Sequence, residues 1–490
     1  MVYVGRVPNG TILDERLEYL RYLMQYTSQA IGFEIDTQSS NPAVRIIDKN
    51  GNTFTPFPGF FNNHAIWGRI RTCFYKDGLI TYGTNNRGDG KARDGTDGSV
   101  LVEIPTAKVY YSFVDSRYHR YLLVPISSDM PFFNNHPSAV QRGGVKKSKI
   151  YISAYESSLA IDSTNGNIKL QSIAGVQPFT GSAIYKIPFT SGGTTQIQIG
   201  NVVTGGTSTA TGTVIATYIS SGTWAGGNAV GYLYLKQITG TFQNAEPLLV
   251  SSIDCATSSD VATSLSFTLT NAETYANNIG SGFGVLNFWF KRYIDMLQII
   301  EAGTLDVPSV FGKGIVNSIA IKLTGADSID SRINVEGTGV GSGTDGQTPI
   351  KWRGIENTHG HLWKHVAGLN VFTDGSYHLI NRDGTGAIAE IMPSGYESGT
   401  GLALADGYIS AIQTDELGAL GFIPKTANAV GSSSSTYFCD KYYYPTNTNS
   451  STFYGGPYNA SDTAGPFLLS NSSINGATNV ALGSFFEYYP

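Results

Sequence analysis

Charged side chains are scarce in this chain, and cysteine is scarcer. Of the 490 residues, 14% are Asp, Glu, Lys or Arg, and three are Cys. A formal net charge of -5 without any run of basic residues disfavours a nucleic-acid-binding protein, which needs a positive surface. The hydrophobic share of 41% is too high for a disordered chain, so folded units with buried cores are expected.

The few cysteines and the lack of long apolar runs indicate the cellular compartment in which the chain is made. Cys73, Cys255 and Cys439 are odd in number and share no C-x-x-C spacing, which argues against a disulfide framework and a zinc site. No run of about 18 apolar residues occurs, and the start MVYVGRVPNG lacks the apolar core of a secretion signal. We therefore expect a protein made in a reducing cytoplasm and without membrane insertion.

Glycine, hydroxyl side chains and aromatic rings are abundant. The chain holds 58 Gly and 29 Tyr, a composition that suits the desolvatable contact surfaces of fibres, shells and lectins. At this length the chain exceeds one ordinary domain, so two or three compact units are expected.

The first expected element is a short helix over residues 11–29. Leu13, Leu17, Leu20 and Met24 form one apolar seam along it. A seam of this length is too short to be stable alone. The helix either packs on its own domain or associates with sister copies or a larger particle, and we interpret residues 1–30 as an attachment and oligomerisation segment.

Two β-rich stretches follow. Residues 31–95 contain short alternating runs such as AVRIID and GLITYG, separated by KNGN and KDG turns, which predicts a small β unit. Residues 191–270 contain only four charged side chains, and strand-like runs such as TGTVIATYI alternate with Gly-rich turns. We predict an all-β module over residues 177–273, rich in Thr, Gly and Ser and inserted into a discontinuous domain of residues 96–176 and 274–490.

The second half has one strong helix and one irregular aromatic segment. Residues 288–301 carry apolar groups around much of the helix circumference, which predicts burial against a sheet. Residues 352–371, WRGIENTHGHLWKHVAGLNV, have too many glycines for a helix and too much apolar surface for a solvated loop. The expected structural residues here, with Arg353 and Glu356 as an ion pair or as turn anchors, are Trp352, Arg353, Glu356 and Trp363.

This aromatic segment resembles a stretch of bacteriophage virion proteins with a C-type-lectin-like domain, a group related to phage tropism determinants. Other similar pieces occur in the same order: LVEIPTAKVYYSF from Leu101, PFFNNHPSAV from Pro131, KIYISAYESS from Lys149, FWFKRYIDMLQIIEAGTLD from Phe288, GYISAIQTDELGALGFIP from Gly407, YFCDKYYY from Tyr437 and YGGPYNASDTAGPFLLSNSSINGATNVALGSFFEYY from Tyr454. The resemblance implies an α+β, β-rich fold: a C-type-lectin-like domain of residues 96–176 and 274–490 with the inserted all-β module and a short N-terminal helix.

The same resemblance implies a role. It indicates a non-enzymatic structural protein of the virion, a head or tail fibre or a capsid decoration, that displays a lectin-like surface for a host receptor or glycan. The implied location is the virion, assembled in the cytoplasm of the host bacterium, and the implied partners are other virion proteins and two sister copies in a homotrimer. The alternatives are a purely architectural capsid or tail protein and a tail-associated glycan-processing enzyme. A buried acid pair in a groove favours the enzyme, and a convex aromatic tip favours display.

Metal and nucleophile patterns are weak. His359, His361 and His365 lack a ligand spacing that suits one helix face, and no carboxylate cluster accompanies them. They are therefore expected to be surface or loop-stacking residues. Since the chain also lacks G-x-S-x-G, P-loop and H-E-x-x-H motifs, we expect no catalytic residue, no metal and no cofactor.

Four glutamates keep the enzyme alternative open. Glu103, Glu156, Glu301 and Glu356 each lie beside bulky apolar residues, and their spacing alone allows a glycosidase pair. Buried carboxylates that accept hydrogen bonds from backbone amides are the commoner explanation of this pattern.

The C-terminal segment carries the candidate recognition surface. Its rigid aromatic rings are interleaved with adaptable amides and hydroxyls, as in an antibody paratope. The candidate ligand-binding residues are Tyr437, Tyr442, Tyr444, Asn447, Tyr454, Tyr458 and Asn459. The competing interpretation is that alternate aromatic residues belong to the core of a final hairpin, since a half-buried strand turns every second side chain inward.

Overall fold

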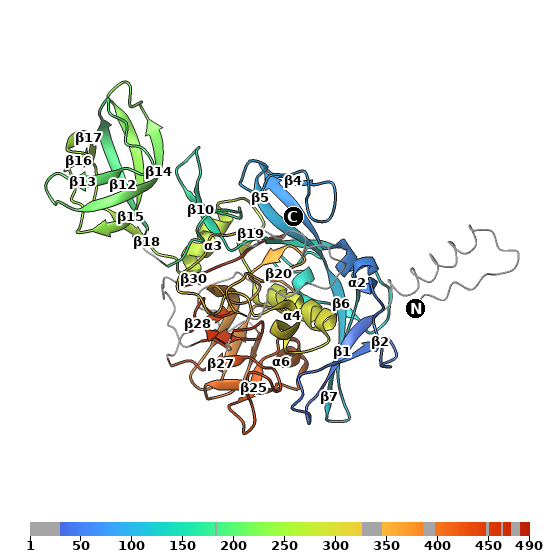
Figure 1. The fold of residues 1–490 in the computed structure, drawn as a ribbon. Coiled ribbons are helices and arrows are strands. Elements are labelled where there is room, and N and C mark those ends of the chain that lie inside the picture. Colours follow the sequence, from blue (N-terminus) through green and yellow to red (C-terminus); the bar gives the residue numbers. More distant parts are fainter. Residues whose placement is uncertain are drawn as a thin grey trace, which may run out of the picture.

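Antiparallel sheets dominate the structure (Figure 1). The computed structural model describes residues 30–181, 184–325, 345–385, 397–446, 450–461, 464–471 and 481–490. Strands make up 38% and helices 11% of the fold. The expected α+β, C-type-lectin-like class is therefore wrong. The physical reason is that only one helix in the described ranges is longer than three turns. Elsewhere, short runs of β-branched and aromatic residues separated by glycines form strands.

The first sheet joins the start of the described chain to residues 107–135. In spatial order its strands are β2 (Arg45–Asp48), β1 (Ile31–Asp36), β7 (Tyr118–Pro125), β6 (Ala107–Val114) and β8 (Asn134–Asn135). Strand β1 lies antiparallel to β7, with Ile31 opposite Leu123. The second sheet also joins distant segments, in the order β19 (Phe283–Val285), β31 (Phe486–Tyr488), β9 (Lys149–Ser153), β5 (Ser99–Pro105), β3 (Arg71–Lys76) and β4 (Leu79–Tyr82). Residues 31–95 thus pair with later strands of the chain in both sheets.

Residues 184–265 form a barrel. Its ladder runs in the order β15 (Ala229–Thr239), β14 (Thr211–Ser221), β13 (Val202–Gly205), β16 (Pro247–Val250), β17 (Ile253–Ser258), β12 (Ile184–Gly192) and β18 (Thr263–Leu265). Strand β15 also pairs with β12, so the ladder closes on itself. A separate apolar cluster that includes Phe189, Trp224 and Leu233 fills the interior. The barrel lies within the range 177–273 in which an all-β module is expected.

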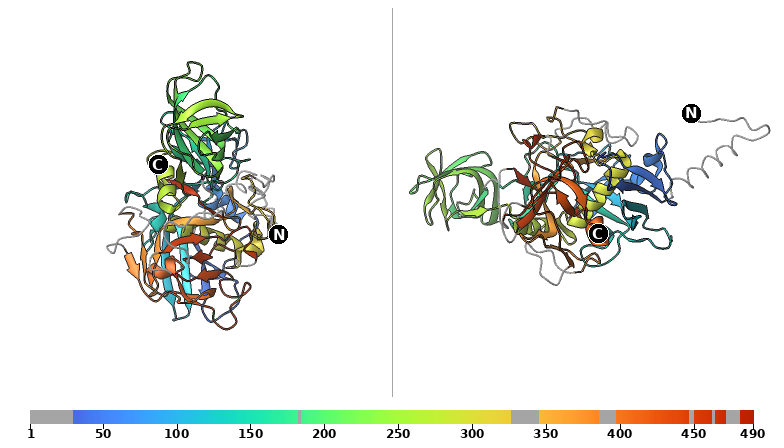
Figure 2. Two further views of the ribbon diagram at one scale, coloured as in Figure 1. Left: turned by 90° about the vertical axis from the view of Figure 1, so that its left-hand side faces the viewer. Right: turned by 90° about the horizontal axis from the view of Figure 1, so that it is seen from below.

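The barrel extends from one end of the remaining structure, here called the body (Figure 2). Hairpin β10 (Ser158–Ile161) and β11 (Ile168–Gln171) of the body reaches it. The Tyr218 hydroxyl of the barrel donates to the Thr164 carbonyl at 2.9 Å, and the Tyr234 hydroxyl donates to the Gly166 carbonyl. A Cβ on Gly166 would lie 2.4 Å from the Tyr218 ring, so this close contact requires glycine.

The largest described sheet of the body gathers the C-terminal third of the chain. Its strands run in the order β24 (Glu397–Gly399), β23 (Tyr377–Leu379), β22 (Trp363–Val371), β28 (Ser450–Tyr454), β29 (Leu469–Ser470), β27 (Lys441–Tyr443), β25 (Gly407–Ile412) and β26 (Pro424–Ala427), and β30 (Leu482–Gly483) pairs with β22. The short hairpin β20 (Lys351–Trp352) and β21 (Ile355–Glu356) precedes it. Strand β22 of this sheet packs against the central helix of the body.

That helix, α4 (Phe288–Ala302), confirms the helix expected over residues 288–301. The Asn287 side chain caps it by accepting from the Phe290 amide at 2.9 Å, and Gly303 ends it in the left-handed region with φ 69°. Its side chains from Phe288 to Ile300 are all buried. Figure 1 shows α4 between the first sheet and the C-terminal sheet, so it forms the centre of the main apolar core.

The other described helices are shorter. They are α2 (Phe60–Asn63), α3 (Leu269–Asn277), α5 (Val307–Phe311) and α6 (Glu416–Leu420), together with the 3-10 turns η1 (Trp67–Arg69) and η2 (Pro137–Ala139). None of the helices in the described ranges has the length and hydropathy that a membrane crossing requires. The helix expected over residues 11–29, with Leu13, Leu17, Leu20 and Met24, lies outside the described residues.

Candidate functional site

Two of the predicted recognition tyrosines lie in the core. Tyr442 on β27 is 0% exposed and Tyr454 on β28 is 1% exposed. Both belong to the main apolar cluster, and the Tyr454 ring lies 4.6 Å from the Lys291 ammonium of α4. The prediction that these two residues form a surface is therefore wrong. Both strands run inside the C-terminal sheet, where every residue of β28 is buried and Tyr442 is the buried residue of β27.

The remaining predicted recognition residues are not brought together. Tyr437, Tyr444 and Tyr458 are half-buried and Asn459 is exposed, while Asn447 lies outside the described residues. The Tyr437 amide donates to the Ser40 carbonyl at 2.8 Å, and the Tyr444 hydroxyl donates to the Thr373 carbonyl. The Tyr458 carbonyl accepts from Ser318 at 2.8 Å. Each of the three tyrosines thus bonds a different part of the body, and these contacts do not bring them together into one aromatic surface.

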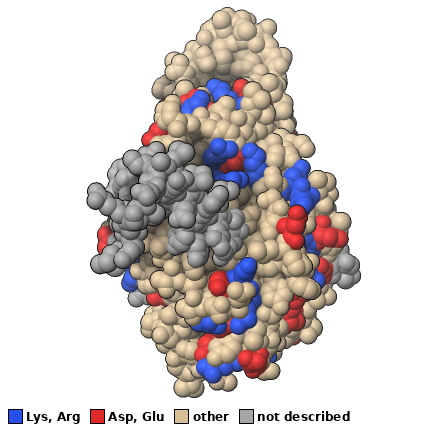
Figure 3. Space-filling view, turned by 90° about the vertical axis from the view of Figure 1, so that its right-hand side faces the viewer, with Lys and Arg blue, Asp and Glu red and all other residues tan. Residues whose placement is uncertain are grey.

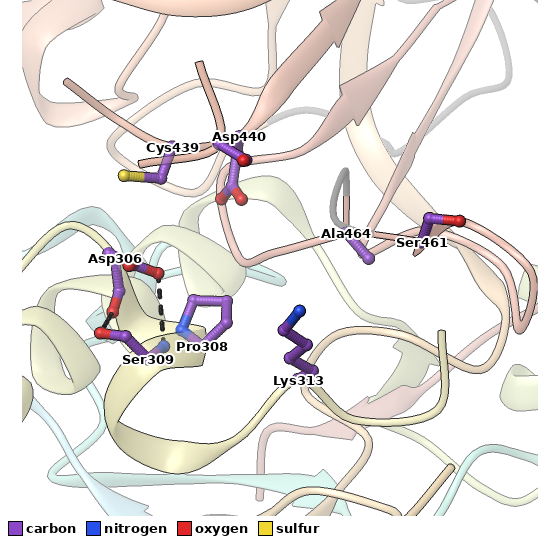
Figure 4. Close-up of a pocket in the computed structure, with 9 residues that line it drawn as sticks. Asp306, Pro308, Ser309, Lys313, Cys439, Asp440, Ser461 and Ala464 are labelled. Carbon is purple, nitrogen blue, oxygen red and sulfur yellow. Dashed lines mark hydrogen bonds between the residues drawn. The ribbon is translucent and has the colours of Figure 1, made fainter. Parts of the chain in front are cut away.

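A cavity of about 320 Å³ lies between α5 and loops of the same C-terminal segment (Figure 4). We call it the tail cavity. Three stretches of chain form it: α5 with the turn after it, the loop before β27 and the loop after β28. Its lining residues are Asp306, Pro308, Ser309, Lys313, Ser434, Cys439, Asp440, Ser461 and Ala464. In Figure 4 the Lys313 side chain extends into the space between Pro308 and Ala464, and the Asp440 carboxyl points toward the same space.

The α5 side of the tail cavity is fixed by a helix cap. The Asp306 side chain accepts from the Ser309 amide at 3.3 Å, and the Ser309 hydroxyl donates to the Asp306 carbonyl at 2.7 Å. Pro308 occupies the first turn, where a missing amide hydrogen costs nothing. Burial raises the pKa of the Asp306 carboxyl, while Ser309 and Lys313 act in the opposite direction. The helix start therefore holds a carboxyl group at the wall of the cavity.

Asp440 also lines the tail cavity and is 2% exposed. Its Oδ2 accepts from the Phe467 amide at 2.7 Å. Burial raises the pKa of Asp440 well above its ordinary value, Asp306 and Asp295 act in the same direction, and Phe467 and Lys291 oppose them. The Asp440 carboxyl therefore takes up a proton more readily than an exposed aspartic acid does.

Cys439 is a poor nucleophile in this setting. Its side chain is 3% exposed, and burial, followed by the nearby Asp306 and Asp440, raises the pKa of the thiol strongly. A reactive cysteine requires the opposite shift, because the thiolate is the nucleophile. The tail cavity thus presents hydrogen-bonding groups without an activated sulfur.

Two of the four predicted structural residues, Trp352 and Arg353, meet at the end of α4. The Trp352 indole donates to Glu301 Oε2 at 2.9 Å. Arg353 donates to the same carboxylate through Nε at 2.8 Å and through Nη2 at 2.6 Å. Arg353 thus pairs with Glu301 rather than with Glu356, whose Oε1 accepts from the Gly325 amide at 2.9 Å. The expected Arg353–Glu356 ion pair is wrong because the β20–β21 turn directs the guanidinium toward α4. Trp363, half-buried, packs edge-on against Tyr443 with ring centroids 6.0 Å apart.

The three histidines of this region are buried, so the expectation of surface or loop-stacking histidines is wrong. His359 bonds the Gly312 carbonyl at 3.0 Å and His365 bonds the Phe267 carbonyl at 3.1 Å. Burial lowers the pKa of each of these two rings to about 4. His361 accepts from the Lys322 amide at 2.9 Å through Nε2, so its Nδ1 carries the proton that it donates to Glu156. In the described part of the chain, no group of three or more His, Cys, Asp or Glu side chains is arranged to hold a metal ion.

The four glutamates singled out in the sequence do not line the tail cavity. Glu103 is held by Arg71 at 3.0 Å, Lys149 at 2.9 Å and the Tyr82 hydroxyl at 2.6 Å. Glu156 pairs with His361 and with Lys364 at 3.1 Å. Side-chain partners therefore hold Glu103, Glu156 and Glu301. Glu356 differs, because its carboxylate accepts a hydrogen bond from a backbone amide, that of Gly325.

Sequence reasoning missed the groups that line the tail cavity. Asp306 is legible in hindsight, because Asp-Val-Pro-Ser is a helix-start pattern with Asp as cap and Pro in the first turn. Asp440 is one of the few charged residues in the charge-poor C-terminal segment. Lys313 carries no local signal, since its role arises from a contact between distant parts of the chain.

Comparisons with known proteins identify no family. No family model matches the chain, and no curated protein matches it. A solved structure named "Major Tropism Determinant U1 Variant" shows 11% sequence identity over 91% of this chain and 91% of that chain, with a TM-score of 0.20. A TM-score this low shows a weak likeness, and neither fold nor function is taken from it.

Proposed function

We propose that this chain is a bacteriophage virion protein that binds the surface of the host cell and has no catalytic role. The ordered sequence pieces from Leu101 to the C-terminal segment support the phage virion assignment. The observation that carries the binding role is the tail cavity, which α5 lines together with loops of the C-terminal segment that the sequence singles out for recognition.

The chemistry of the tail cavity favours binding. Burial raises the pKa of the Cys439 thiol and of the Asp440 carboxyl, so the charged form of each group is disfavoured. Neither is an activated nucleophile. Hydrogen-bonding groups around a small apolar wall are typical of a recognition site.

The arrangement of the body also supports display. The cavity walls lie on loops, but each wall is fixed to rigid elements: α5 by its Asp306 cap, and Asp440 by the Phe467 amide. Strand β1 and the barrel lie on opposite sides of the molecule in Figure 1. Figure 3 shows mixed charges on the visible face of the body and few on the upper part of the barrel. A protein anchored on the β1 side would hold the barrel away from the anchoring particle.

Attachment through residues 1–30 and assembly as a homotrimer are further parts of the proposal. Light scattering of the purified chain, compared with a variant that begins at residue 31, tests them together. A trimer that becomes a monomer on truncation supports both, and a truncated chain that stays trimeric places the contact elsewhere.

Binding to intact bacteria tests the proposed function. Fluorescently labelled protein is added to the host of the phage that encodes it and to a phage-resistant strain that has lost its receptor. The expected result is saturable labelling of the host and little labelling of the resistant strain. Equal, unsaturable labelling of both strains would contradict a receptor-binding role and would favour a purely architectural protein.

The second candidate is a glycan-processing enzyme. Asp306 and Asp440 both line the tail cavity, and burial raises the pKa of both carboxyls. A raised carboxyl pKa is what a glycosidase general acid needs. Incubation with purified host polysaccharide tests this. Release of reducing ends that stops in Asp440→Asn would establish the enzyme, whereas an undigested polysaccharide favours binding.

A further inference from the structure

A second cavity lies where the barrel meets the body, and we call it the junction cavity. Its volume of about 400 Å³ falls within the roughly 300–1,000 Å³ that small-molecule sites occupy. The body contributes hairpin β10–β11 and the chain after β11, and the barrel contributes β12, β14 and β15. The junction cavity shares no lining residue with the tail cavity. Boundaries between folded units are common places for binding sites, so this cavity is a candidate for one.

Apolar side chains from both units line the junction cavity. Leu159 and Phe179 lie on the body side, and Ile184 and Ile215 lie on the barrel side. Phe179 is 4% exposed and packs against Phe267 with ring centroids 4.6 Å apart, which fixes the position of its ring. Walls of this kind favour an apolar ligand group, because that group leaves water when it binds.

Three exposed polar side chains also line the junction cavity. Lys236 and Gln237 are adjacent on β15, and Gln177 belongs to the body. The ammonium group of Lys236 forms no ion pair with a described residue, and it is the only charged group among the described lining residues. Residues 182–183, which precede β12, are Ser and Ala and add no charge. The described lining thus holds one cation without a counter-ion.

The backbone of β15 is irregular at the junction cavity. Thr213 of β14 lies opposite Lys236 of β15. Two residues earlier, Thr211 lies opposite Thr239, so β15 holds one extra residue between these pairs. Gln237 lies in this bulge with φ 54°, in the left-handed region that strains a residue with a side chain. Adjacent side chains of a regular strand face opposite sides, whereas the bulge lets Lys236 and Gln237 both line the cavity. Strained backbone of this kind is typical of ligand sites.

The single cation selects among charged ligand groups. A carboxylate carries one negative charge, which Lys236 balances, and its two oxygens can accept from the side-chain amides of Gln177 and Gln237. A phosphate monoester carries a charge of about −1.5 to −2 near pH 7, so one lysine leaves part of that charge uncompensated. An ammonium group is repelled by Lys236. A carboxylate therefore fits the polar side of the junction cavity best.

We propose that the junction cavity binds a small apolar carboxylate, with its apolar part against Phe179 and Ile215 and its carboxylate at Lys236. Medium-chain fatty acids are the simplest members of this ligand class. The inference is independent of the proposed function, because the junction cavity and the tail cavity have separate linings. Both units supply contacts, so the site exists only when the barrel is docked on the body.

Calorimetry on the full chain with octanoate tests the proposal. Octanamide, octylamine and octyl phosphate are the neutral, cationic and phosphate probes with the same apolar chain. We expect octanoate to bind saturably at one site, and octanamide to bind at least about threefold more weakly, since an exposed charge pair contributes modestly. Octylamine is expected to bind more weakly still. Absence of saturable octanoate binding, or tighter binding of any of the other three probes, would overturn the proposal.

A charge variant locates the binding site. Lys236→Met removes the ammonium group but keeps an apolar stem, so octanoate affinity is expected to fall to that of octanamide while octanamide affinity stays unchanged. Lys425→Met, at an exposed position of β26 in the C-terminal sheet, is the matched control and is expected to bind octanoate like the wild type. Equal octanoate affinity in the two variants would refute the junction site.

A bulge variant tests the second polar group. Glycine adopts a φ of 54° without strain, so Gln237→Gly is expected to keep the urea midpoint of the wild type or to raise it. The variant lacks the side-chain amide, so octanoate is expected to bind about twofold more weakly or less tightly still. Weaker binding in a variant of undiminished stability supports a ligand role for the bulge. Unchanged octanoate affinity in both Gln237→Gly and Lys236→Met would refute the proposal, once near-ultraviolet circular dichroism shows that both are folded.

Discussion

Replacement of Glu301 by Gln is expected to weaken the fold strongly. Glu301 lies at the end of α4, its side chain is 1% exposed, and it accepts three hydrogen bonds from Trp352 and Arg353. The Arg353 side chain is 10% exposed and also donates to the Trp67 carbonyl at 3.1 Å. This cluster ties α4 to the β20–β21 hairpin and to η1.

The magnitude follows from the charge that remains. Glu301→Gln preserves the shape but leaves the Arg353 guanidinium largely buried without its counter-ion, and it places an amide NH₂ group against an arginine donor. Breaking a buried pair in this way costs about 3–5 kcal/mol. Glu397→Gln is a matched control, because Glu397 pairs with Arg382 at 3.1 Å while the side chains are 27% and 38% exposed. An exposed pair contributes roughly 0–1 kcal/mol.

Urea unfolding followed by tryptophan fluorescence measures the effect, since Trp67 and Trp352 both adjoin the cluster. We expect the free energy of unfolding to fall by about 3–5 kcal/mol in Glu301→Gln and by less than about 1 kcal/mol in Glu397→Gln. Equal, small losses in the two variants would refute the view that the Glu301 cluster anchors the aromatic segment.

Three further predictions follow from the same contacts. Replacing residues 184–265 by a short Gly/Ser linker should leave the body with a cooperative unfolding transition. The reason is that Ile184 and Leu265 are paired in an antiparallel ladder and so lie about 5 Å apart, a gap that a short linker spans. Loss of the transition would show that the body needs the barrel in order to fold. Tyr442→Ala should destabilise the body by about 3–5 kcal/mol, as for other large buried rings; a stable variant would mean that this ring is not in the core. Acidification from pH 6.5 toward pH 4 should destabilise the fold through His359: burial lowers its folded pKa from 6.5 to about 4, so the unfolded chain binds the proton first, and up to about 3 kcal/mol of stability present above pH 6.5 is lost. Urea midpoints for His359→Gln should fall less between pH 7 and pH 5 than those of the wild type, and an identical fall would exclude this histidine as a cause.

Local patterns predicted the elements whose causes are local. The apolar groups around its circumference predicted the α4 helix, and the structure adds the Asn287 cap before Phe288. Alternating runs such as TGTVIATYI predicted strands, and β14 contains that run. In both cases the spacing of apolar side chains along the sequence was enough to predict whether the segment forms a helix or a strand.

Pairings between distant segments were not legible. Nothing in the IGFEID run of β1 specifies Tyr118–Pro125 as its partner, because alternation fixes a face and leaves the neighbour open. The same limit explains the tyrosines. Alternation predicts that about half of an aromatic strand is buried, but the core covers β28 on both faces and also takes in Tyr442 of β27, so neither Tyr442 nor Tyr454 stays at the surface.

The expected fold class failed for a related reason. Sequence pieces in a familiar order indicated a C-type-lectin-like domain, yet order along the chain does not determine how short strands combine into sheets. The tail cavity was invisible at that stage, since Asp306 and Asp440 come from distant segments that meet only in the folded body. Arg353 likewise finds Glu301 rather than the nearer Glu356.

Competition for phage adsorption tests the central claim most directly. Host cells are incubated with increasing amounts of the purified chain, and the adsorption rate of the phage that encodes it is then measured. A receptor-binding virion protein is expected to occupy the receptors and slow adsorption in a saturable manner, with Asp440→Leu far less effective and Lys425→Met as effective as the wild type. An adsorption rate that stays constant at saturating amounts of a folded wild-type chain would contradict the proposed function.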